Sequence, residues 1–327
     1  MANSNSSRRK LLVTAAALPL AALTGGAHAQ SDRPIRFIMP FAAGSGTDTA
    51  FRPYIEAMAR HLKQPIVIDN RGGANGLIGM EAAAKAAPDG YTFALGNVGI
   101  MVINRFIYSK LPYDPDRDFD LVGTALGTAN ALTVRKDLEA NSVAELIALA
   151  KRQPGRLKVA SGGIGTTGHL SAALFDTMAG TQMVHVPYKS AVDAFKDMVN
   201  GDIDVLIENV ALSSTFIRGG RVRPLGVTSR TRVASLPDVP TLDEAGLKGF
   251  EILAWAGFVV PKGTPAAMIQ RLNEATRAAV TNPEVRKATE SFSLDAIPGS
   301  PQEFAALIQS EIPKWSALVK RTGAKLD

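Results

Sequence analysis

Apolar residues recur along the chain in short runs, and longer stretches with helical periodicity separate most of these runs. Runs typical of strands occupy residues 35–39, 66–69, 91–95, 121–123, 132–134, 157–160, 184–186, 205–208, 225–228 and 258–260. Stretches typical of amphipathic helices include 143–150, 169–179, 191–199, 283–291 and 301–321. Such alternation predicts an α/β protein with mostly parallel sheets.

Two of the strand-like runs lead through a glycine-rich loop into a helix. In the first, the run 35–39 is followed by the first glycine loop, residues 42–48; in the second, the run 157–160 is followed by the second glycine loop, residues 161–168. The first N–H groups of a helix lack backbone partners and lie at the positive end of its dipole, so each loop is a candidate anion site. Two such sites predict a clamp that closes on a small anion from both sides.

The candidate ligand-binding residues lie in these loops and at other strand ends, because ligands of open α/β sheets bind beyond the carboxyl ends of the strands. The loops offer backbone N–H groups and hydroxyls, and two further strand-like runs end in Gly-Asn and Glu-Asn. The predicted ligand-binding residues are Phe41, Ala43, Gly44, Ser45, Gly46, Thr47, Asp48, Gly96, Asn97, Ser161, Gly162, Gly165, Thr166, Thr167, His169, Glu208 and Asn209.

Several of these residues have a structural interpretation as well. The first loop could be only a tight turn, and Asp48 could cap the helix that follows instead of binding an ammonium group of the ligand. His169 opens the second helix and could simply pack there or donate to the loop. Trp255 could line the hinge or cleft, whereas Phe258 is expected in the core.

The second loop also contains Gly163-x-Gly165-x-x-Gly168, the pattern of dinucleotide-binding loops. That pattern requires a carboxylate about 20 residues later, at the end of the next strand, and none is present at 186–189. A phosphate-binding P-loop is excluded because His169 occupies its lysine position. No nucleotide or other cofactor is therefore predicted.

Enzymatic and metal sites find little support in the sequence. No G-x-S-x-G motif occurs, and the sequence places no histidine near Ser45 or Ser161, so we predict no catalytic residues. The three histidines after residue 29 include no pair with metal-ligand spacing, so no metal site is expected.

The N-terminus has the pattern of a cleaved secretory signal. Arg8, Arg9 and Lys10 precede an apolar run that is too short to span a bilayer, and small residues flank a cleavage point after Ala29. The Arg-Arg pair fits the twin-arginine route and ordinary secretion equally. The absence of cysteine excludes disulfides, thiol catalysis, cysteine-ligated zinc and an acylated-cysteine anchor.

Removal of residues 1–29 changes the composition of the chain. These residues carry three basic and no acidic side chains, so the net charge falls from +6 to +3, with 33 Lys and Arg against 30 Asp and Glu. Nucleic-acid binding thereby loses its main support, and no nucleic-acid partner is expected. No later run of about 20 apolar residues occurs, so the mature chain is expected to be a soluble periplasmic protein. Its length allows two domains.

Short motifs spread over nearly the whole mature chain resemble the periplasmic solute-binding proteins of tripartite tricarboxylate transporters, the Bug family. The matching motifs lie at 40–48, 64–71, 87–92, 111–115, 142–146, 184–189, 236–241 and 261–265. Two positions depart from the family pattern: Glu208 stands where relatives usually have aspartate, and Ala43 interrupts a run of glycines.

The resemblance implies a two-lobed Venus-flytrap protein, in which each lobe is a mostly parallel sheet flanked by helices. Lobe one is expected to comprise residues 30–127 plus 254–327, and lobe two residues 128–253. The implied function is to bind a small organic acid in the cleft, as a monomer, and to deliver it to membrane permease subunits. The acid could be a di- or tricarboxylate, an acidic amino acid or an aromatic acid. The alternatives are an exported α/β enzyme acting on a carboxylate or phosphate ester, and a sensor subunit.

Overall fold

The computed structural model describes residues 33–188 and 190–326, and residues 33–327 form one compact unit. The predicted signal peptide, residues 1–29, lies outside the described residues. The strands are β1 (Ile35–Met39), β2 (Ile66–Asn70), β3 (Thr92–Asn97), β4 (Phe119–Arg135), β5 (Lys158–Ser161), β6 (Val184–Pro187), β7 (Val205–Asn209), β8 (Val222–Val227), β9 (Leu253–Pro261) and β10 (Asp295–Ala296).

Helices connect most of these strands. They are α1 (Gly46–Leu62), α2 (Leu77–Ala84), α3 (Asn104–Ile107), α4 (Val143–Arg152), α5 (Thr167–Ala179), α6 (Ala191–Asn200), α7 (Val210–Arg218), α8 (Ala266–Ala279), α9 (Pro283–Ser291) and α10 (Pro301–Thr322), with the short turns η1 (Ala74–Gly76) and η2 (Gly99–Ile103). None of the helices in the described part of the chain has the length and apolar character needed to span a membrane.

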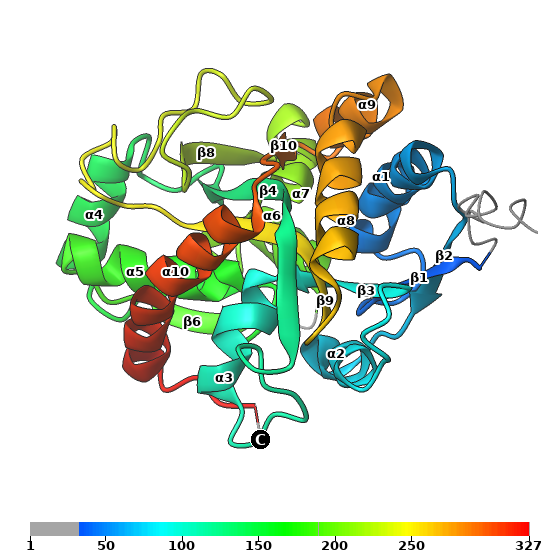
Figure 1. Ribbon diagram of the computed structural model, residues 1–327. Helices are drawn as coiled ribbons and strands as arrows, with labels where there is room; N and C mark the ends of the chain where they lie inside the picture. The colour runs from blue at the N-terminus through cyan, green and yellow to red at the C-terminus, as the bar shows by residue number, and fades with distance from the viewer. Residues whose placement is uncertain (1–32, 189, 327) are drawn as a thin grey trace, which may run out of the picture. The chain divides into compact units, whose positions relative to one another are not determined.

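The strands form one mixed sheet in the order β2-β1-β3-β9-β4-β7-β5-β6, and β8 and β10 pair with β4 outside this path. Pairing is parallel within β2-β1-β3 and within β7-β5-β6, and antiparallel where β9 and β4 lie between them. Figure 1 shows β4 as a long central strand, with α1 and β1–β3 on one side and α4, α5 and β6 on the other. The predicted two-lobed α/β fold is confirmed.

The central strand β4 was expected as two separate strands, at 121–123 and 132–134, and that prediction was wrong. Residues 124–131 are small or polar except for Leu126, so they show no apolar run in the sequence. In the structure this segment is nevertheless buried, because strands pair with it on both edges and the helices α7, α8 and α10 pack on it. The strand β4 pairs with β9 as far as Ala129 and with β7 and β8 from Asn130 or Ala131 onward. One strand therefore belongs to both halves of the sheet: the first half, with β1, β2, β3 and β9, and the second half, with β5, β6, β7 and β8.

The helices that follow the two glycine loops are both capped by hydroxyl side chains. Ser45 precedes α1 and accepts a hydrogen bond from the backbone N–H of Asp48, and Thr166 precedes α5 and accepts one from that of His169. Capping satisfies one of the N–H groups that a helix start leaves without a partner. The helix α5 begins two residues before the predicted start at 169, because Thr166 ends the loop.

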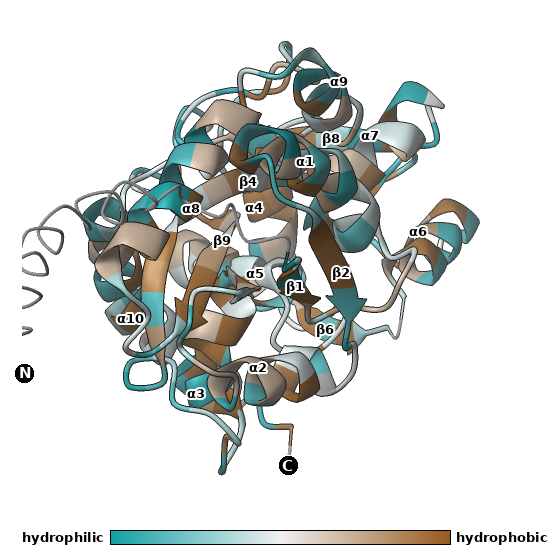
Figure 2. Cartoon of the chain, turned by 45° about the vertical axis from the view of Figure 1, so that its right-hand side comes forward, coloured by the Kyte–Doolittle hydropathy of each residue, from teal (hydrophilic) through white to brown (hydrophobic). Residues whose placement is uncertain are grey.

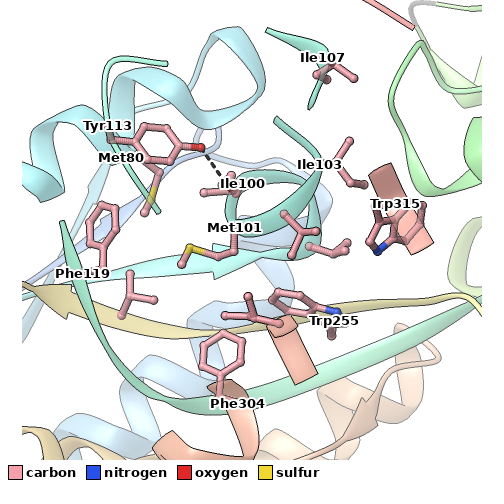
Figure 3. Packing of buried hydrophobic residues seen from close by; sticks show 14 of the residues in the cluster. Met80, Ile100, Met101, Ile103, Ile107, Tyr113, Phe119, Trp255, Phe304 and Trp315 are labelled. Carbon is pink, nitrogen blue, oxygen red and sulfur yellow. Dashed lines mark hydrogen bonds between the residues drawn. The ribbon is translucent and has the colours of Figure 1, made fainter. Parts of the chain in front are cut away.

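Apolar side chains cover both faces of the sheet. Figure 2 shows hydrophobic residues gathered in central strands such as β9 and hydrophilic residues on the outer faces of helices such as α1. Phe258 of β9 is fully buried, as predicted. Figure 3 shows Trp255, Phe304 and Trp315 packed in the cluster that joins η2, β9 and α10. The helix α10 thus covers the first half of the sheet, and it also packs on α5 of the second half.

Candidate functional site

The carboxyl ends of the strands in the two halves point toward the middle of β4. Asn97, at the end of β3, pairs with Ala256 of β9, which pairs in turn with Leu126 of β4. Asn209, at the end of β7, pairs with Asn130 of β4. Four residues of strand span roughly 14 Å. Because β3 and β7 run in opposite directions, the two sets of strand ends converge on this short segment.

Both glycine loops follow strands of these converging sets. Ile38 of β1 lies level with Ala94 of β3, so the first loop leaves the sheet beside the end of β3. Ala160 of β5 lies level with Leu206 of β7, so the second loop leaves the sheet beside the end of β7. The two loops therefore approach the middle of β4 from opposite sides. No hydrogen bond joins them in the part of the chain that the structure describes.

The first loop presents several N–H groups at the start of α1. Gly44 has a φ of +76°, a conformation that favours glycine, and Ala43, Gly44 and Gly46 are exposed. Ser45 and Thr47 are half-buried. The backbone N–H of Ser45 donates to a carbonyl inside the loop, whereas those of Ala43, Gly46 and Thr47 have no partner among the described residues. This loop retains donors that a carboxylate could use.

The buried side chain of Asp48 holds this loop in shape. Its side chain is completely buried and accepts hydrogen bonds from the Gly44 N–H at 2.8 Å and from Asn70 Nδ2 at 2.9 Å. The Arg52 guanidinium adds two more, at 2.9 and 3.2 Å. Burial raises the pKa of this carboxyl, but the hydrogen bonds from Asn70, Gly44 and Arg52 outweigh burial, so its pKa lies below the ordinary value. Both side-chain oxygens of Asp48 thus already accept hydrogen bonds from other groups of the protein.

The other predicted residues of the first half also have internal contacts. The Asn97 side-chain oxygen accepts from the Ile100 N–H at 2.9 Å and so caps η2. Gly96 is buried, and a Cβ there would lie 3.0 Å from the Met101 side chain. Phe41 packs against two hydrophobic clusters while remaining partly exposed.

Hydrogen bonds between side chains and backbone groups hold the second loop in shape. Ser161 is completely buried, and its hydroxyl donates to the Gly163 carbonyl at 3.1 Å. The Thr166 hydroxyl donates to the same carbonyl at 2.8 Å. The Gly165 N–H donates to His169 Nδ1 at 3.2 Å. His169 therefore accepts a hydrogen bond from the loop, which differs from both sequence-based alternatives, simple packing and donation to the loop.

Two histidines stack behind the second loop. The rings of His169 on α5 and His185 on β6 lie 4.0 Å apart, and His185 Nε2 lies 2.7 Å from Ser161 Oγ. The expectation that no histidine lies near Ser161 was wrong, because the pairing of β5 with β6 brings His185 beside it. Burial lowers the pKa of His169 to about 4, with a smaller effect from His185, and burial also lowers the pKa of His185. Both rings are therefore neutral at pH 7.

Glu208 and Asn209 end β7 next to the second loop. Glu208 is 9 % exposed, and its carboxylate accepts from the Asn209 N–H at 2.8 Å. Burial raises the pKa of this carboxyl, although hydrogen bonds from the N–H groups of Asn209 and Gly162 lower it in part. The side-chain oxygen of Asn209 is buried and has no hydrogen-bond partner among the described residues.

Further residues near the site were not identified from the sequence. Asn130, in the middle of β4, is fully buried, and its side-chain oxygen lies 3.5 Å from Thr167 Oγ1. A Cβ on Gly165 would lie 2.9 Å from Ile107 Cδ1 of α3, so the second loop touches an element of the first half. The position of Asn70 at a strand end, like that of Asn97, was a signal that could have found it.

Cavities and metal ligands do not change this picture. Two cavities, of about 490 and 400 Å³, are lined by residues 105–118 and by a set from β5, α5, β6 and α10, respectively. His169 lines the second cavity, but no residue of the first loop lines either one. Within the described residues, no group of three histidine, aspartate or glutamate side chains is placed to hold a metal ion.

Comparisons with known proteins point to one family. Residues 50–324 match the model of the tripartite tricarboxylate transporter family receptor, TctC. The UPF0065 protein in the tcbD-tcbE intergenic region of Pseudomonas sp. (strain P51) is 38 % identical, over 96 % of this chain and 94 % of that protein.

Two solved structures have the same fold. R. palustris Rpa4515 with adipate is 35 % identical with a TM-score of 0.78, over 90 % of this chain and 99 % of that one. MatC from Rhodopseudomonas palustris with bound malate is 31 % identical with a TM-score of 0.73, over 88 % of this chain and 99 % of that one.

Proposed function

Because this chain belongs to the tripartite tricarboxylate transporter receptor family, we propose that it is a periplasmic receptor for a small organic carboxylate. It binds the acid between its two lobes and delivers it to a membrane permease. The observation that carries the proposal is the convergence of two glycine loops on residues 126–130 of β4. Similar proteins with adipate and malate support a carboxylate as the ligand.

The lobes are residues 30–127 plus 254–327, and 128–253. Support comes from the change of pairing partners along β4 between Ala129 and Asn130. Closure about this region brings the second loop onto a ligand that the first loop has bound. The ligand-binding residues are those predicted from the sequence other than Asp48, Ser161 and His169, with Asn130 in addition. Asp48, Ser161 and His169 act as positioning residues, because their polar atoms hold the loops in shape.

The energy of such a site is sufficient without an arginine that contacts the ligand. A hydrogen bond between a neutral donor and a carboxylate contributes roughly 1.5–3 kcal/mol, and a helix N-terminus adds about 0.3–1 kcal/mol. The unpartnered N–H groups of Ala43, Gly46 and Thr47 could supply three such bonds. Micromolar binding needs about 8 kcal/mol, which a few of these bonds provide. Bridging waters add further contacts at little entropic cost.

The protein performs no catalysis in this proposal. Ser161 and His185 are the closest approach to a nucleophile and base, at 2.7 Å. Ser161 is fully buried, so its oxygen is not accessible to a substrate. The chain acts as a monomer, and residues 1–29 are removed during export to the periplasm.

A thermal-shift screen tests the receptor function. The panel contains succinate, adipate, citrate, glutamate, benzoate and 6-aminohexanoate, each at increasing concentration. At one hundred times the dissociation constant a ligand raises the free energy of unfolding by about 2.7 kcal/mol. The proposal is contradicted if none of the acids stabilises the protein, or if the protein turns over an acid that it binds.

Two variants in the first turn of α1 locate the binding site. The hydroxyl of Thr47 has no partner among the described residues, and Thr47→Val removes it at nearly constant shape. We expect about tenfold weaker binding of the stabilising acid, measured by titration calorimetry. Thr49→Val is the matched control, because Thr49 lies two residues later on the same helix and is exposed. Equal effects of the two changes would place the ligand elsewhere.

A further inference from the structure

We propose that the second loop selects a ligand group that donates hydrogen bonds and carries no negative charge, so that the ligand is a monocarboxylate with an ammonium group at its far end. This inference rests on the proposed function, and it names the class of acid. The residue that determines the selection is Glu208.

Glu208 already occupies one donor of the second loop, the Gly162 N–H. Its carboxylate lies close to Gly162, since Oε2 would be 3.0 Å from a Cβ at that position. The N–H groups of Gly162 and Asn209 both stabilise its charged form. A carboxylate of the protein therefore lies where a second carboxylate of a ligand would otherwise bind.

The two loops differ in how their buried acid is balanced. Asp48 beneath the first loop forms an ion pair with Arg52 at 2.9 Å, so that loop carries no net charge and keeps free N–H groups. Glu208 forms no ion pair with a cationic side chain among the described residues. Burial without a counter-charge disfavours the ionised form, and a proton or a cationic ligand group is needed to balance it.

A second observation indicates a missing donor at the same place. The side-chain oxygen of Asn209 is buried and accepts no hydrogen bond in the described structure. Buried polar atoms are nearly always paired in folded proteins, by protein, water or ligand. The oxygen of Asn130, level with Asn209 on β4, has only Thr167 at 3.5 Å. Glu208, Asn209 and Asn130 thus place three side-chain acceptor groups beside the second loop.

The charged and titratable groups around Glu208 do not remove this imbalance. His169 of α5 and His185 of β6 are neutral at pH 7, because burial lowers the pKa of each. Tyr188, which follows β6, donates its hydroxyl to Asp197 of α6 at 2.7 Å. A ligand carboxylate placed here would face the charge of Glu208, whereas an ammonium group would form charge-assisted hydrogen bonds with it.

Matched pairs of ligands test the inference. Each pair has the same chain length and differs only in its far end: succinate and 4-aminobutanoate, glutarate and 5-aminopentanoate, adipate and 6-aminohexanoate. In calorimetric titrations of the full mature protein at pH 7, we expect the amino acid of at least one pair to bind about tenfold more tightly than its diacid. Tighter binding of the diacid in each pair, or no binding by any of the six, overturns the inference. Stabilisation by another acid of the screening panel would leave the receptor function intact.

The variant Glu208→Gln removes the charge and keeps an oxygen for the Asn209 N–H. We expect the preference for the amino acid over the diacid to fall at least tenfold. If Glu208 only supports the loop, both ligands weaken equally and the ratio is unchanged, which overturns the inference. Glu311→Gln is the matched control, because it removes a buried carboxylate of α10 that accepts a hydrogen bond from Trp315 Nε1, and it should leave the ratio unchanged. If a variant does not fold, the titrations of the matched ligand pairs with the unmodified protein still test the inference.

Discussion

At the scale of single residues, the stacked histidines show how a buried polar group is kept in one protonation state. His169 is 6 % exposed, its Nδ1 accepts from the second loop, and its ring lies 4.0 Å from that of His185. A proton on either ring would place a charge in a poorly solvated site beside the other ring. The pKa of His169 is therefore lowered to about 4, from an ordinary value of 6.5.

This shift predicts a loss of stability in mild acid. The unfolded chain binds a proton at His169 below pH 6.5, whereas the folded chain does so only near pH 4. Stability should therefore fall as the pH drops through this range, by up to about 3 kcal/mol, and level off below it. Urea unfolding at pH 7.5 and pH 4.5 measures the difference.

The variant His169→Asn provides the comparison, because its amide oxygen can still accept from Gly165. Its stability should decline less than that of the unmodified protein between the two pH values. A decline of equal size in both proteins would show that His169 is not the group responsible, and would direct attention to His185.

At the scale of elements, the second loop depends on a glycine that contacts the other half of the molecule. Gly165 has a φ of +79°, and a Cβ there would lie 2.9 Å from Ile107 Cδ1. Ile107 is itself 2 % exposed, so it has little room to shift. The position requires both a left-handed conformation and close approach, and only glycine meets both conditions.

Gly165→Ala should therefore reduce stability and ligand affinity together. The left-handed conformation costs about 1–2 kcal/mol for alanine, and displacement of Ile107 adds to this. Gly155→Ala is the matched control, since Gly155 has a φ of +69° and nothing within 4 Å of its Cβ position. Denaturant unfolding measures the effect on stability, and calorimetry measures the effect on ligand affinity. Gly155→Ala should lower the stability and leave the affinity unchanged. Unchanged affinity in Gly165→Ala would mean that this contact has no part in binding.

At the scale of the whole molecule, the two halves share structural elements. The strand β4 pairs with strands of both, and α10 packs on η2 in the first half and on α5 in the second. Loss of either half would expose one side of β4 and one end of α10. The described chain behaves as a single compact unit for this reason.

We therefore expect the protein to unfold in one cooperative transition. Both tryptophans, Trp255 and Trp315, lie in the cluster of the first half, so their fluorescence reports that half. Far-UV circular dichroism reports the helices of both halves. The two signals should give the same urea midpoint. Midpoints that differ would show that the lobes unfold separately.

The sequence was sufficient for features that depend on neighbouring residues. Helix and strand periodicity, the two glycine loops and the motifs of the family all lie within short segments, where local conformational preferences act. The glycine loops do precede capped helices, as predicted. The pairing of Asp48 with Arg52 was also within reach, because residues four apart on a helix are adjacent.

The tertiary structure decided which distant residues meet. Ser161 lies beside His185, 24 positions later, and Asp48 beside Asn70, 22 positions later, because of the register between parallel strands. The continuity of β4 was equally hidden, since small and polar residues are buried there by neighbours distant in sequence. The sequence by itself determined most of the elements and the kind of protein. Which buried acidic side chain has a cationic partner, and where the two loops converge, depended on long-range strand pairing that no local pattern encodes.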